Sequence, residues 1–375
     1  MPWKQVSAMD QREELVLLAQ LEGANRRELF RRFGISPKVG YKWLNRVAAG
    51  EVPGFADHSR RPLSSPRQID SAMEERICAV RAAHPAWGAR KIRAFLEARG
   101  QAMPAVSTVH QALKRHGLIL PGAAGAQASL RFEADAPNDL WQMDFKGHSR
   151  LGDGSRLHPL TVIDDHSRFS PCIAALGSET GAEVKAALTR VFTVHGLPLR
   201  LFTDNGTPWG GSQGNAWTSF RVWLLKLGVD LIHSRPYHPQ SRGKNERFHR
   251  SLGEEVMSLA PLATRAEAQK AFDRWRQIYN HQRPHDALQL KVPASRYRPS
   301  PRPFPAKLAE PDYAEGTITR KVSSTAGYVS FRGRYWKVPE AFLGERLAIR
   351  PLDADGRFGV FFASHLVATI DLTEG

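Results

Sequence analysis

Residues 140–145 read LWQMDF, and residues 201–206 read LFTDNG. In each stretch one carboxylate, Asp144 or Asp204, stands within or directly after an apolar run with the character of a β-strand. A carboxylate in such a position is unfavourable unless it is paired or bound to a metal ion. Because strand ends in a mixed sheet gather at an edge where loops build sites, we expect the two acids to meet there.

A third carboxylate follows in GKNERF, residues 243–248, where Glu246 stands on a helix expected from 242 to about 260. Three carboxylates can share two Mg²⁺ or Mn²⁺ ions, since these hard cations prefer oxygen ligands. Two such ions, about 3.5–4 Å apart, hold the attacking and leaving oxygens of a phosphodiester displacement. The attacking group is then water in strand cleavage and a DNA 3′-OH in strand joining.

The sequence around these motifs alternates between strands and helices. The expected strands are 140–146, 157–164, 169–175, 199–203 and 229–233, and the expected helices are 181–195, 217–227 and 265–281. Three hairpin-like strands followed by helix, strand, helix, strand and helix is the order of a ribonuclease H-like mixed sheet. We therefore expect a catalytic core over 138–282 that includes the last of these helices.

The first fifty residues indicate three helices, expected at 10–22, 26–33 and 37–49, with Gly34 in the turn before the third. This pattern is typical of a helix-turn-helix domain, residues 1–50, although a three-helix protein-binding module is the alternative. The third helix would read DNA. The residues expected to face DNA are Lys38, Tyr41, Lys42 and Arg46, and those expected to pack inward are Val39, Trp43, Leu44 and Val47.

Residues 51–67 are rich in proline, glycine and serine and read as a basic linker. Arg60 and Arg61 could follow DNA phosphates there, or the linker could simply be solvated. Residues 68–120 predict a second helix-turn-helix domain. Its helices are expected at 70–84, 89–99 and 107–116, the first capped by Asp70 and the third by Ser107.

The remaining boundaries follow from composition. Residues 121–137 read as a second linker, residues 283–312 as a Pro-rich linker, and residues 313–375 as a small β barrel of about five strands. The expected fold class is therefore multidomain α and α/β: helix-turn-helix units, a ribonuclease H-like core and a C-terminal barrel.

Charge and composition limit the partners. The 375 residues include 53 Lys and Arg against 37 Asp and Glu, a formal net charge of +16 at pH 7, which favours nucleic acid over an anionic membrane. The two cysteines, Cys78 and Cys172, lack ligand-spaced partners, so neither a disulfide framework nor a zinc finger is expected. With no signal peptide and no run of about 18 apolar residues, we expect no membrane partner and a cytoplasmic location.

Several motifs together resemble one family. WQMDF (141–145), TDNG (203–206), PYHPQSRGKNE (236–246) and YNHQRPHDAL (279–288) are similar to segments of DDE-type insertion-sequence transposases with a retroviral-integrase-like catalytic core. VIDDHSRF (162–169) resembles the second strand of that core. The spacing from Asp204 to Glu246 is longer than in many relatives, and we place the extra length in residues 208–218.

The resemblance implies a role for each matching residue. Asp144, Asp204 and Glu246 would be the catalytic residues and hold two Mg²⁺ or Mn²⁺ ions. Asn205 and Gly206 would shape the loop beside Asp204. The residues implied to meet the DNA end are Lys244, Arg247 and Arg250, while His238 and His249 would support the site or contact phosphate, or be ordinary surface histidines.

The resemblance also implies partners: double-stranded DNA with terminal inverted repeats, target DNA, and at least a second copy of the chain on DNA, in a bacterial, chromosome-associated setting. A catalytically silent DNA-binding regulator and a nuclease that hydrolyses but never joins are the alternatives. Among nearby acids, a β-turn explains Asp164 and Asp165 better than metal binding does. Glu254 and Glu255 are expected to be solvated or paired with arginine.

Overall fold

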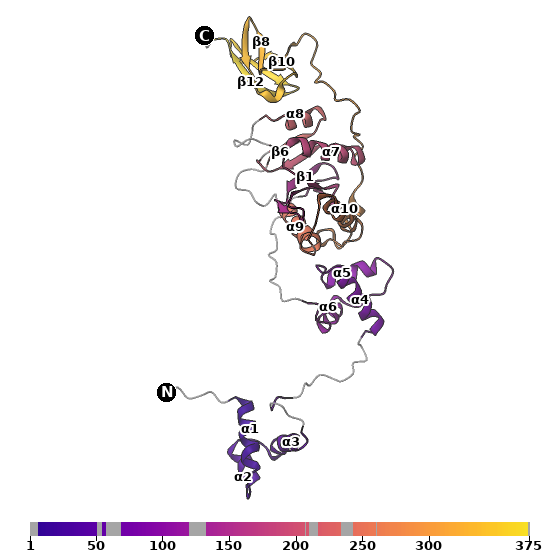
Figure 1. Cartoon of the computed structure of the whole chain (residues 1–375), viewed down its shortest axis with the longest axis vertical. Coiled ribbons are helices and arrows are strands. Elements are labelled where there is room, and N and C mark those ends of the chain that lie inside the picture. The colour runs from indigo at the N-terminus through magenta and orange to yellow at the C-terminus, as the bar shows by residue number, and fades with distance from the viewer. Residues whose placement is uncertain are drawn as a thin grey trace. The chain divides into compact units, whose positions relative to one another are not determined.

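The computed structural model describes residues 7–50, 55–57, 69–119, 133–206, 208–209, 217–233, 243–259 and 261–373. The chain divides into two compact units, Met1–Gln68 and Ile69–Gly375. In Figure 1 the first unit is indigo and the second runs from purple to yellow.

Side-chain caps start each helix described in the first unit. Ser7, Asn25 and Ser36 each accept a backbone N–H from the residue three positions on. The prediction that the first helix begins at Asp10 is wrong, because Asp10 bonds back to the Ser7 N–H and completes a capping box. The helices are α1 (Ala8–Ala19), α2 (Arg26–Arg32) and α3 (Pro37–Ala48).

Helices α2 and α3 meet closely at Gly40. A Cβ added to Gly40 would lie 2.2 Å from the Phe30 ring, so a larger residue would force the helices apart. Trp43, one turn further along α3, is also buried. Val39 was predicted to pack inward but is 40% exposed, because it lies about 100° around the helix from Gly40, the position that makes the contact.

Three helices begin the second unit: α4 (Ser71–Ala83), α5 (Ala89–Glu97) and α6 (Val106–Arg115). Ile77, Ile92 and Val109, one from each helix, are fully buried in a shared core. Asp70 caps α4 as predicted, by accepting the Met73 N–H. Ser107 does not cap α6, which starts one residue earlier and has no side-chain cap.

A mixed sheet follows, as the sequence predicts. Strands β1, β5 and β6 run parallel, β3 runs antiparallel to β1, and β4 and the short β2 pair with different parts of β3. The strands are β1 (Leu140–Phe145), β2 (Ser149–Arg150), β3 (Arg156–Asp164), β4 (Cys172–Leu176), β5 (Arg200–Thr203) and β6 (Asp230–His233).

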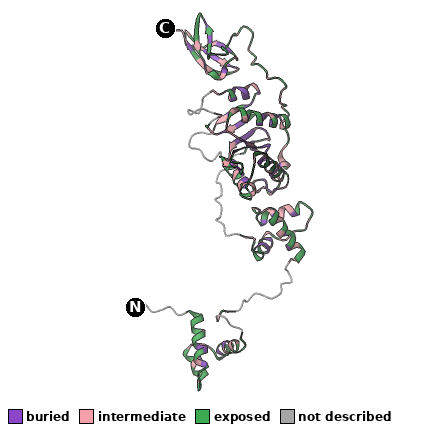
Figure 2. Ribbon diagram, viewed as in Figure 1, coloured by how far each residue is buried: buried purple, intermediate pink, exposed green. Residues whose placement is uncertain are grey.

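Helices pack on both faces of this sheet, and most residues of its central strands are buried (Figure 2). Trp141 and Met143 of β1 pack in one cluster with α7 (Gly181–His195) and α8 (Ser219–Lys226). Ile163 and Ile173 pack in another with α9 (Gly243–Leu252) and α10 (Arg265–His281). Side chains alternate between the two faces along a strand, so Asp144, which follows Met143, lies on the opposite face of the sheet, the face covered by α9.

The segment after α10 lies against the core instead of leaving it as a free linker. The Ser300 N–H donates to the His195 carbonyl at 2.8 Å, and the Leu197 N–H donates to the Arg302 carbonyl at 2.7 Å. The Tyr297 ring stacks on Phe169 with ring centroids 4.0 Å apart. Two short 3₁₀ helices, Asp286–Leu288 and Pro293–Arg296, form part of this segment.

The C-terminal strands form an open sheet and a hairpin. The sheet order is β12-β11-β10-β7, and β8 pairs only with β9 among the described strands, so the closed barrel predicted from the sequence is not what these strands form. The strands are β7 (Ile318–Lys321), β8 (Tyr328–Phe331), β9 (Arg334–Lys337), β10 (Arg346–Pro351), β11 (Arg357–Phe362) and β12 (His365–Asp371).

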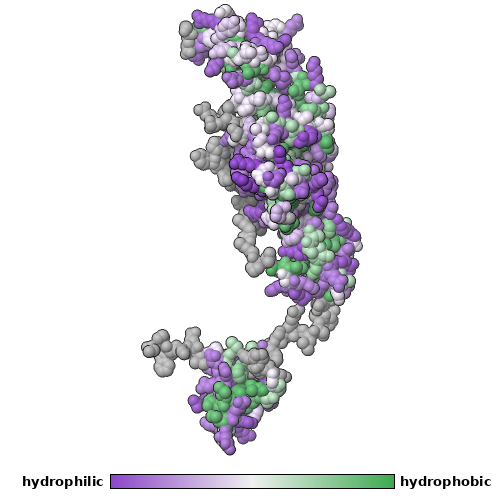
Figure 3. Space-filling model, in the orientation of Figure 1, coloured by the Kyte–Doolittle hydropathy of each residue, from purple (hydrophilic) through white to green (hydrophobic). Residues whose placement is uncertain are grey.

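Helix α8 packs against the mixed sheet on one side and against the C-terminal strands on another. Val222 is buried within their hydrophobic cluster, and the Trp217 and Phe342 ring centroids are 5.0 Å apart. The Lys226 ammonium lies 3.0 Å from both carboxylate oxygens of Glu345. In the visible face of Figure 3 hydrophilic and hydrophobic residues are interspersed. Among the described helices, none has the length and apolar character needed to cross a membrane.

Candidate active site

Asp144 and Asp204 lie at the ends of two neighbouring parallel strands. In the pair formed by β1 and β5, Leu140 lies opposite Arg200 and Gln142 opposite Phe202. Extending this register by two residues sets Asp144 opposite Asp204. Both residues are partly exposed. The sheet therefore brings the backbones of the two predicted acids together at one edge.

Two N–H donors hold the Asp204 carboxylate. Its Oδ1 accepts the Gly206 backbone N–H at 3.0 Å and the Trp209 indole N–H at 2.8 Å. A Cβ added to Gly206 would lie 3.2 Å from Oδ1 and 3.4 Å from Oδ2, so the backbone approaches the carboxylate closely. Gly206, and Asn205 between it and Asp204, therefore lie where the sequence suggested, in the turn beside this acid.

Glu246 lies in the first turn of α9 and is exposed. Three residues further along this helix, His249 Nε2 lies 2.7 Å from the Thr161 hydroxyl oxygen. That hydroxyl donates to the Asp144 carbonyl at 3.0 Å, and Thr161 stands opposite Asp144 in the register of β1 and β3. These contacts hold the helix that carries Glu246 against the strand that carries Asp144.

His249 makes this contact as a neutral ring. Burial, aided by the positive charge of Lys146, lowers its pKa to about 4. Because the Thr161 hydroxyl has one hydrogen and donates it to the Asp144 carbonyl, His249 must donate through its Nε2–H. In this structure His249 therefore acts as a packing contact between α9 and the sheet.

The three predicted carboxylates do not form one compact group in this structure. Across the part of the chain that the structure describes, no three His, Cys, Asp or Glu residues lie close enough together to hold a metal ion. The donor types nevertheless fit a hard divalent cation, since Asp144 and Asp204 offer carboxylate oxygens at one sheet edge.

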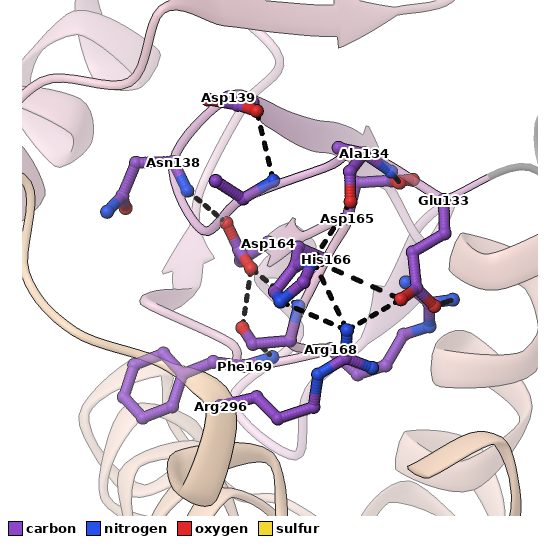
Figure 4. A network of polar contacts seen from close by, with 12 residues as sticks. Glu133, Ala134, Asn138, Asp139, Asp164, Asp165, His166, Arg168, Phe169 and Arg296 are labelled. Atoms are coloured by element: carbon purple, nitrogen blue, oxygen red, sulfur yellow. Dashed lines mark hydrogen bonds and ion pairs between the residues drawn. The ribbon is translucent and has the colours of Figure 1, made fainter.

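Asp164 and Asp165 are buried structural residues, as the predicted turn suggests. Asp164 accepts the Ser167 N–H at 2.7 Å, and burial raises the pKa of this carboxyl group. Asp165 accepts the Ala134 N–H at 2.7 Å and the Gln142 side-chain amide at 2.6 Å. Figure 4 shows these carboxylates turned toward backbone and side-chain donors, within the fold.

The basic residues of α9 differ in their surroundings. Lys244 Nζ lies 2.5 Å from Asp165 Oδ1, and burial lowers the pKa of this ammonium group. Arg247 is 60% exposed and lies 3.9 Å from Asp286. Arg250 is also exposed. The two arginines are thus accessible at the helix surface, whereas Lys244 reaches into the buried network of Asp165.

Most of the residues predicted to face DNA on the third helix, α3, are exposed to solvent. Lys38, Tyr41 and Lys42 are exposed on α3. Arg46 is half-buried, with its guanidinium 4.8 Å from the centre of the Trp43 ring. Three further predicted residues, Arg60, Arg61 and His238, lie outside the described residues.

Sequence reasoning missed two contacts that shape the site. Trp209 is a core residue at 1% exposure, and the sequence does not predict its bond to Asp204. The signal was a buried indole, whose N–H needs an acceptor. Thr161 gave a similar signal, as a polar residue inside the apolar run of β3 that is fully buried and needs a partner.

Comparison with known families gives matches along most of the chain. Residues 134–239 and 227–293 match models of an integrase core domain. Residues 317–375 match the C-terminal domain of IS481 family transposases, and residues 39–113 match a homeodomain-like domain.

Individual relatives include proteins of insertion elements and retroviruses. The 31.7 kDa protein of insertion element IS407 from Burkholderia multivorans is 30% identical over 184 residues, 48% of this chain and 58% of that protein. The Gag-Pro-Pol polyprotein of Simian retrovirus SRV-2 is 35% identical over 116 residues, 31% of this chain and 6% of the polyprotein. The match thus spans little more than half of the insertion-element protein.

A solved structure of the simian T-cell lymphotropic virus intasome, in complex with PP2A regulatory subunit B56 gamma, also aligns with the chain. The alignment covers 79% of this chain and 95% of that one, at 17% sequence identity and a TM-score of 0.41. A likeness at this level says nothing about activity.

Proposed function

We propose that the chain is an active DNA transposase of the insertion-sequence type, because residues 134–239 and 227–293 match integrase core domain models and residues 317–375 match the C-terminal domain of IS481 family transposases. It would bind the terminal inverted repeats of its element, cleave DNA there and join the ends to target DNA in the bacterial cytoplasm. The net charge of +16 and the helical units before the core support binding to double-stranded DNA.

One observation carries the proposal: the register of β1 and β5 directs Asp144 and Asp204 to the same sheet edge. Glu246 would join them from α9, which the contact between His249 and Thr161 holds beside β1. We propose these three carboxylates as the catalytic residues and as the ligands of two Mg²⁺ or Mn²⁺ ions.

Such ions, when bound, would supply positive charge to the phosphodiester oxygens. The residues of this chain would orient the ligands and the DNA. Gly206 and Trp209 donate N–H groups to the Asp204 carboxylate, and His249 contacts Thr161 from the helix that carries Glu246. The residues that we propose to contact the DNA end are Arg247 and Arg250, whereas the predicted contact of Lys244 with DNA does not agree with its ion pair to the buried Asp165. The residues that we propose for the terminal repeat are Lys38, Tyr41, Lys42 and Arg46, with Arg60 and Arg61 along the linker.

The reaction also requires two DNA ends to be held together, so we propose at least a dimer on DNA. Light scattering of the chain with a terminal-repeat duplex would test this assembly. A mass that corresponds to one protomer per complex would contradict it.

The central test is the variant Asp144→Asn, which removes a carboxylate charge and changes little else in shape. We expect cleavage and strand transfer on a terminal-repeat duplex to fall by about a hundredfold or more, because a metal site contributes several kcal/mol to catalysis. Asp153→Asn, in an exposed turn where the carboxylate bonds to Ser155, is the matched control and should keep wild-type rates. Wild-type strand transfer by Asp144→Asn would overturn the proposal.

One observation favours a second candidate, a catalytically silent DNA-binding regulator. Within the described residues, the three carboxylates do not form a compact group. A gel shift with terminal-repeat DNA, in parallel with a joining assay in Mg²⁺ and in Mn²⁺, separates the two functions. Specific binding without a joined product in either metal would support the regulator.

A further inference from the structure

Trp209 combines complete burial with a polar contact to a proposed catalytic residue. Only 1% of its surface is exposed, and its indole N–H donates to Asp204 Oδ1 at 2.8 Å. The same oxygen accepts the Gly206 N–H at 3.0 Å. Two donors on one oxygen define how the carboxylate is rotated, and therefore which direction its second oxygen takes.

The Trp209 ring also contacts the strand that carries the other aspartate. It stacks on Phe145, the residue after Asp144, with ring centroids 5.3 Å apart and planes 24° from parallel. On another side it packs against Phe220 of α8, with centroids 6.0 Å apart. One side chain thus touches the end of β1, the first turn of α8 and the Asp204 carboxylate.

We propose that Trp209 is a positioning residue that fixes the orientation of the Asp204 carboxylate and couples it to the end of β1 beside Asp144. The inference rests on the proposed function, which gives Asp204 its role as a metal ligand. Residues that hydrogen-bond to metal ligands typically change metal affinity or activity by about 10–100-fold when they are replaced. Trp209 would act through this route without touching metal or DNA.

A simpler explanation is that Trp209 only fills space in the core. The variant Trp209→Phe separates the two roles, because it keeps an aromatic ring against Phe145 and Phe220 but removes the N–H donor. Trp223→Phe is the matched control. Trp223 is a buried tryptophan of the same hydrophobic cluster whose ring packs on Phe192 and Phe220, and its replacement removes a similar volume.

The first measurement is the melting temperature of the full chain against Mg²⁺ concentration, without DNA. A ligand that binds the folded state raises the melting temperature once its concentration exceeds the dissociation constant. We expect Trp209→Phe to move the midpoint of this rise to about tenfold higher Mg²⁺. Trp223→Phe should lower the melting temperature in metal-free buffer but keep the wild-type midpoint.

Two outcomes would overturn the inference alone: a wild-type midpoint in Trp209→Phe, or equal shifts in the two variants, which would indicate a packing effect. A wild-type chain whose melting temperature does not respond to Mg²⁺ would instead remove the metal site itself, and the inference with it. The two failures are therefore distinguishable.

Cleavage of a terminal-repeat duplex gives the second measurement. Trp209→Phe should need about tenfold more Mg²⁺ for half-maximal rate and recover much of the rate at saturating metal. A rate defect that persists unchanged at all Mg²⁺ concentrations would overturn the positioning role.

Discussion

At the scale of single residues, the proposed site depends on how closely the backbone approaches one carboxylate. Gly206 lies beside Asp204, and both carboxylate oxygens would be within 3.4 Å of an added methyl group. Contacts this short require the neighbouring group to shift. Because two N–H donors hold the carboxylate, a shift would disturb its orientation more than the stability of the fold.

We therefore predict that Gly206→Ala lowers the rate of strand transfer by about tenfold, while the melting temperature changes by no more than about 2 °C. Gly243→Ala is the control, since a Cβ there meets nothing within 4 Å among the residues that the structure describes. Parallel cleavage assays and thermal unfolding would measure both quantities. A Gly206→Ala variant with full activity would show that the close approach has no functional role.

The sequence predicted the acids but not their partners. An acid inside an apolar strand is conspicuous, so Asp144 and Asp204 could be singled out without a structure. Trp209 bonds across a turn to a residue five positions earlier, and Thr161 bonds to an α9 residue far along the chain. Such contacts depend on the tertiary arrangement, so the local sequence pattern around Trp209 or Thr161 does not predict them.

At the scale of elements, the end of α9 is stabilised by a buried ion pair. The helix continues into one π-helical turn, Gly253–Met257, which contains Glu255. Glu255 lies 2.9 Å from the Arg283 guanidinium and accepts the Trp275 indole N–H at 2.9 Å, and both ionic side chains are less than a tenth exposed. The pairing of Glu255 with arginine agrees with one of the two fates that the sequence suggested.

We predict that Arg283→Met lowers the free energy of unfolding by about 3–5 kcal/mol, because it leaves a buried carboxylate without its countercharge. The double variant Glu255→Leu with Arg283→Met should recover part of this loss. As a control, Arg31→Met breaks an ion pair with Glu28 in which both side chains are exposed, and it should have almost no effect. Urea unfolding measures all three, and a loss in Arg283→Met as small as the control's would contradict the prediction.

Element boundaries were predictable where periodicity and a terminal signal agreed. The helices at 181–195 and 265–281 were predicted with the bounds found in the structure. The start of α1 was missed because Ser7 competes with Asp10 as a cap, and both belong to one capping box. The strand at 365–371 gives only a weak signal in the sequence, because its residues are mostly half-exposed and lack a clear alternation.

At the scale of the whole molecule, several buried histidines make folding sensitive to acid. Burial lowers the pKa of His195 to about 4, of His249 to about 4 and of His285 to about 3, from an ordinary value of 6.5. Below pH 6.5 the unfolded chain binds protons that the folded chain excludes, so unfolding becomes easier as the pH falls toward 4. Asp164, with a raised pKa, acts in the opposite direction.

We predict that the melting temperature falls by roughly 5 °C or more between pH 7 and pH 5. His195→Phe should reduce this slope, because it removes one of the groups that are buried in the neutral form. His110→Gln, at an exposed position on α6, should leave the slope as it is. Thermal unfolding followed by circular dichroism at several pH values gives the comparison, and a flat profile for the wild-type chain would refute the prediction.

The closed barrel was the main architectural error, and its cause is physical. A pattern of strands separated by turns predicts a β domain, but it does not predict whether the first and last strands pair to close a barrel. Here the open sheet and its hairpin share a hydrophobic cluster with Val222 of α8, so a helix from the core buries apolar surface that a closed barrel would have buried by itself.

This sharing bears on how the protein can be divided for study. Val222 belongs to the C-terminal cluster while its neighbour Trp223 belongs to the cluster of the mixed sheet, so α8 packs into two hydrophobic clusters at once. A fragment ending near residue 312 would lack the C-terminal strands and would expose the hydrophobic residues that pack against them, including Trp217 and Leu225. Such an exposed hydrophobic surface promotes aggregation. Anyone wanting an isolated core should first make that surface polar, or leave the last sixty or so residues in place.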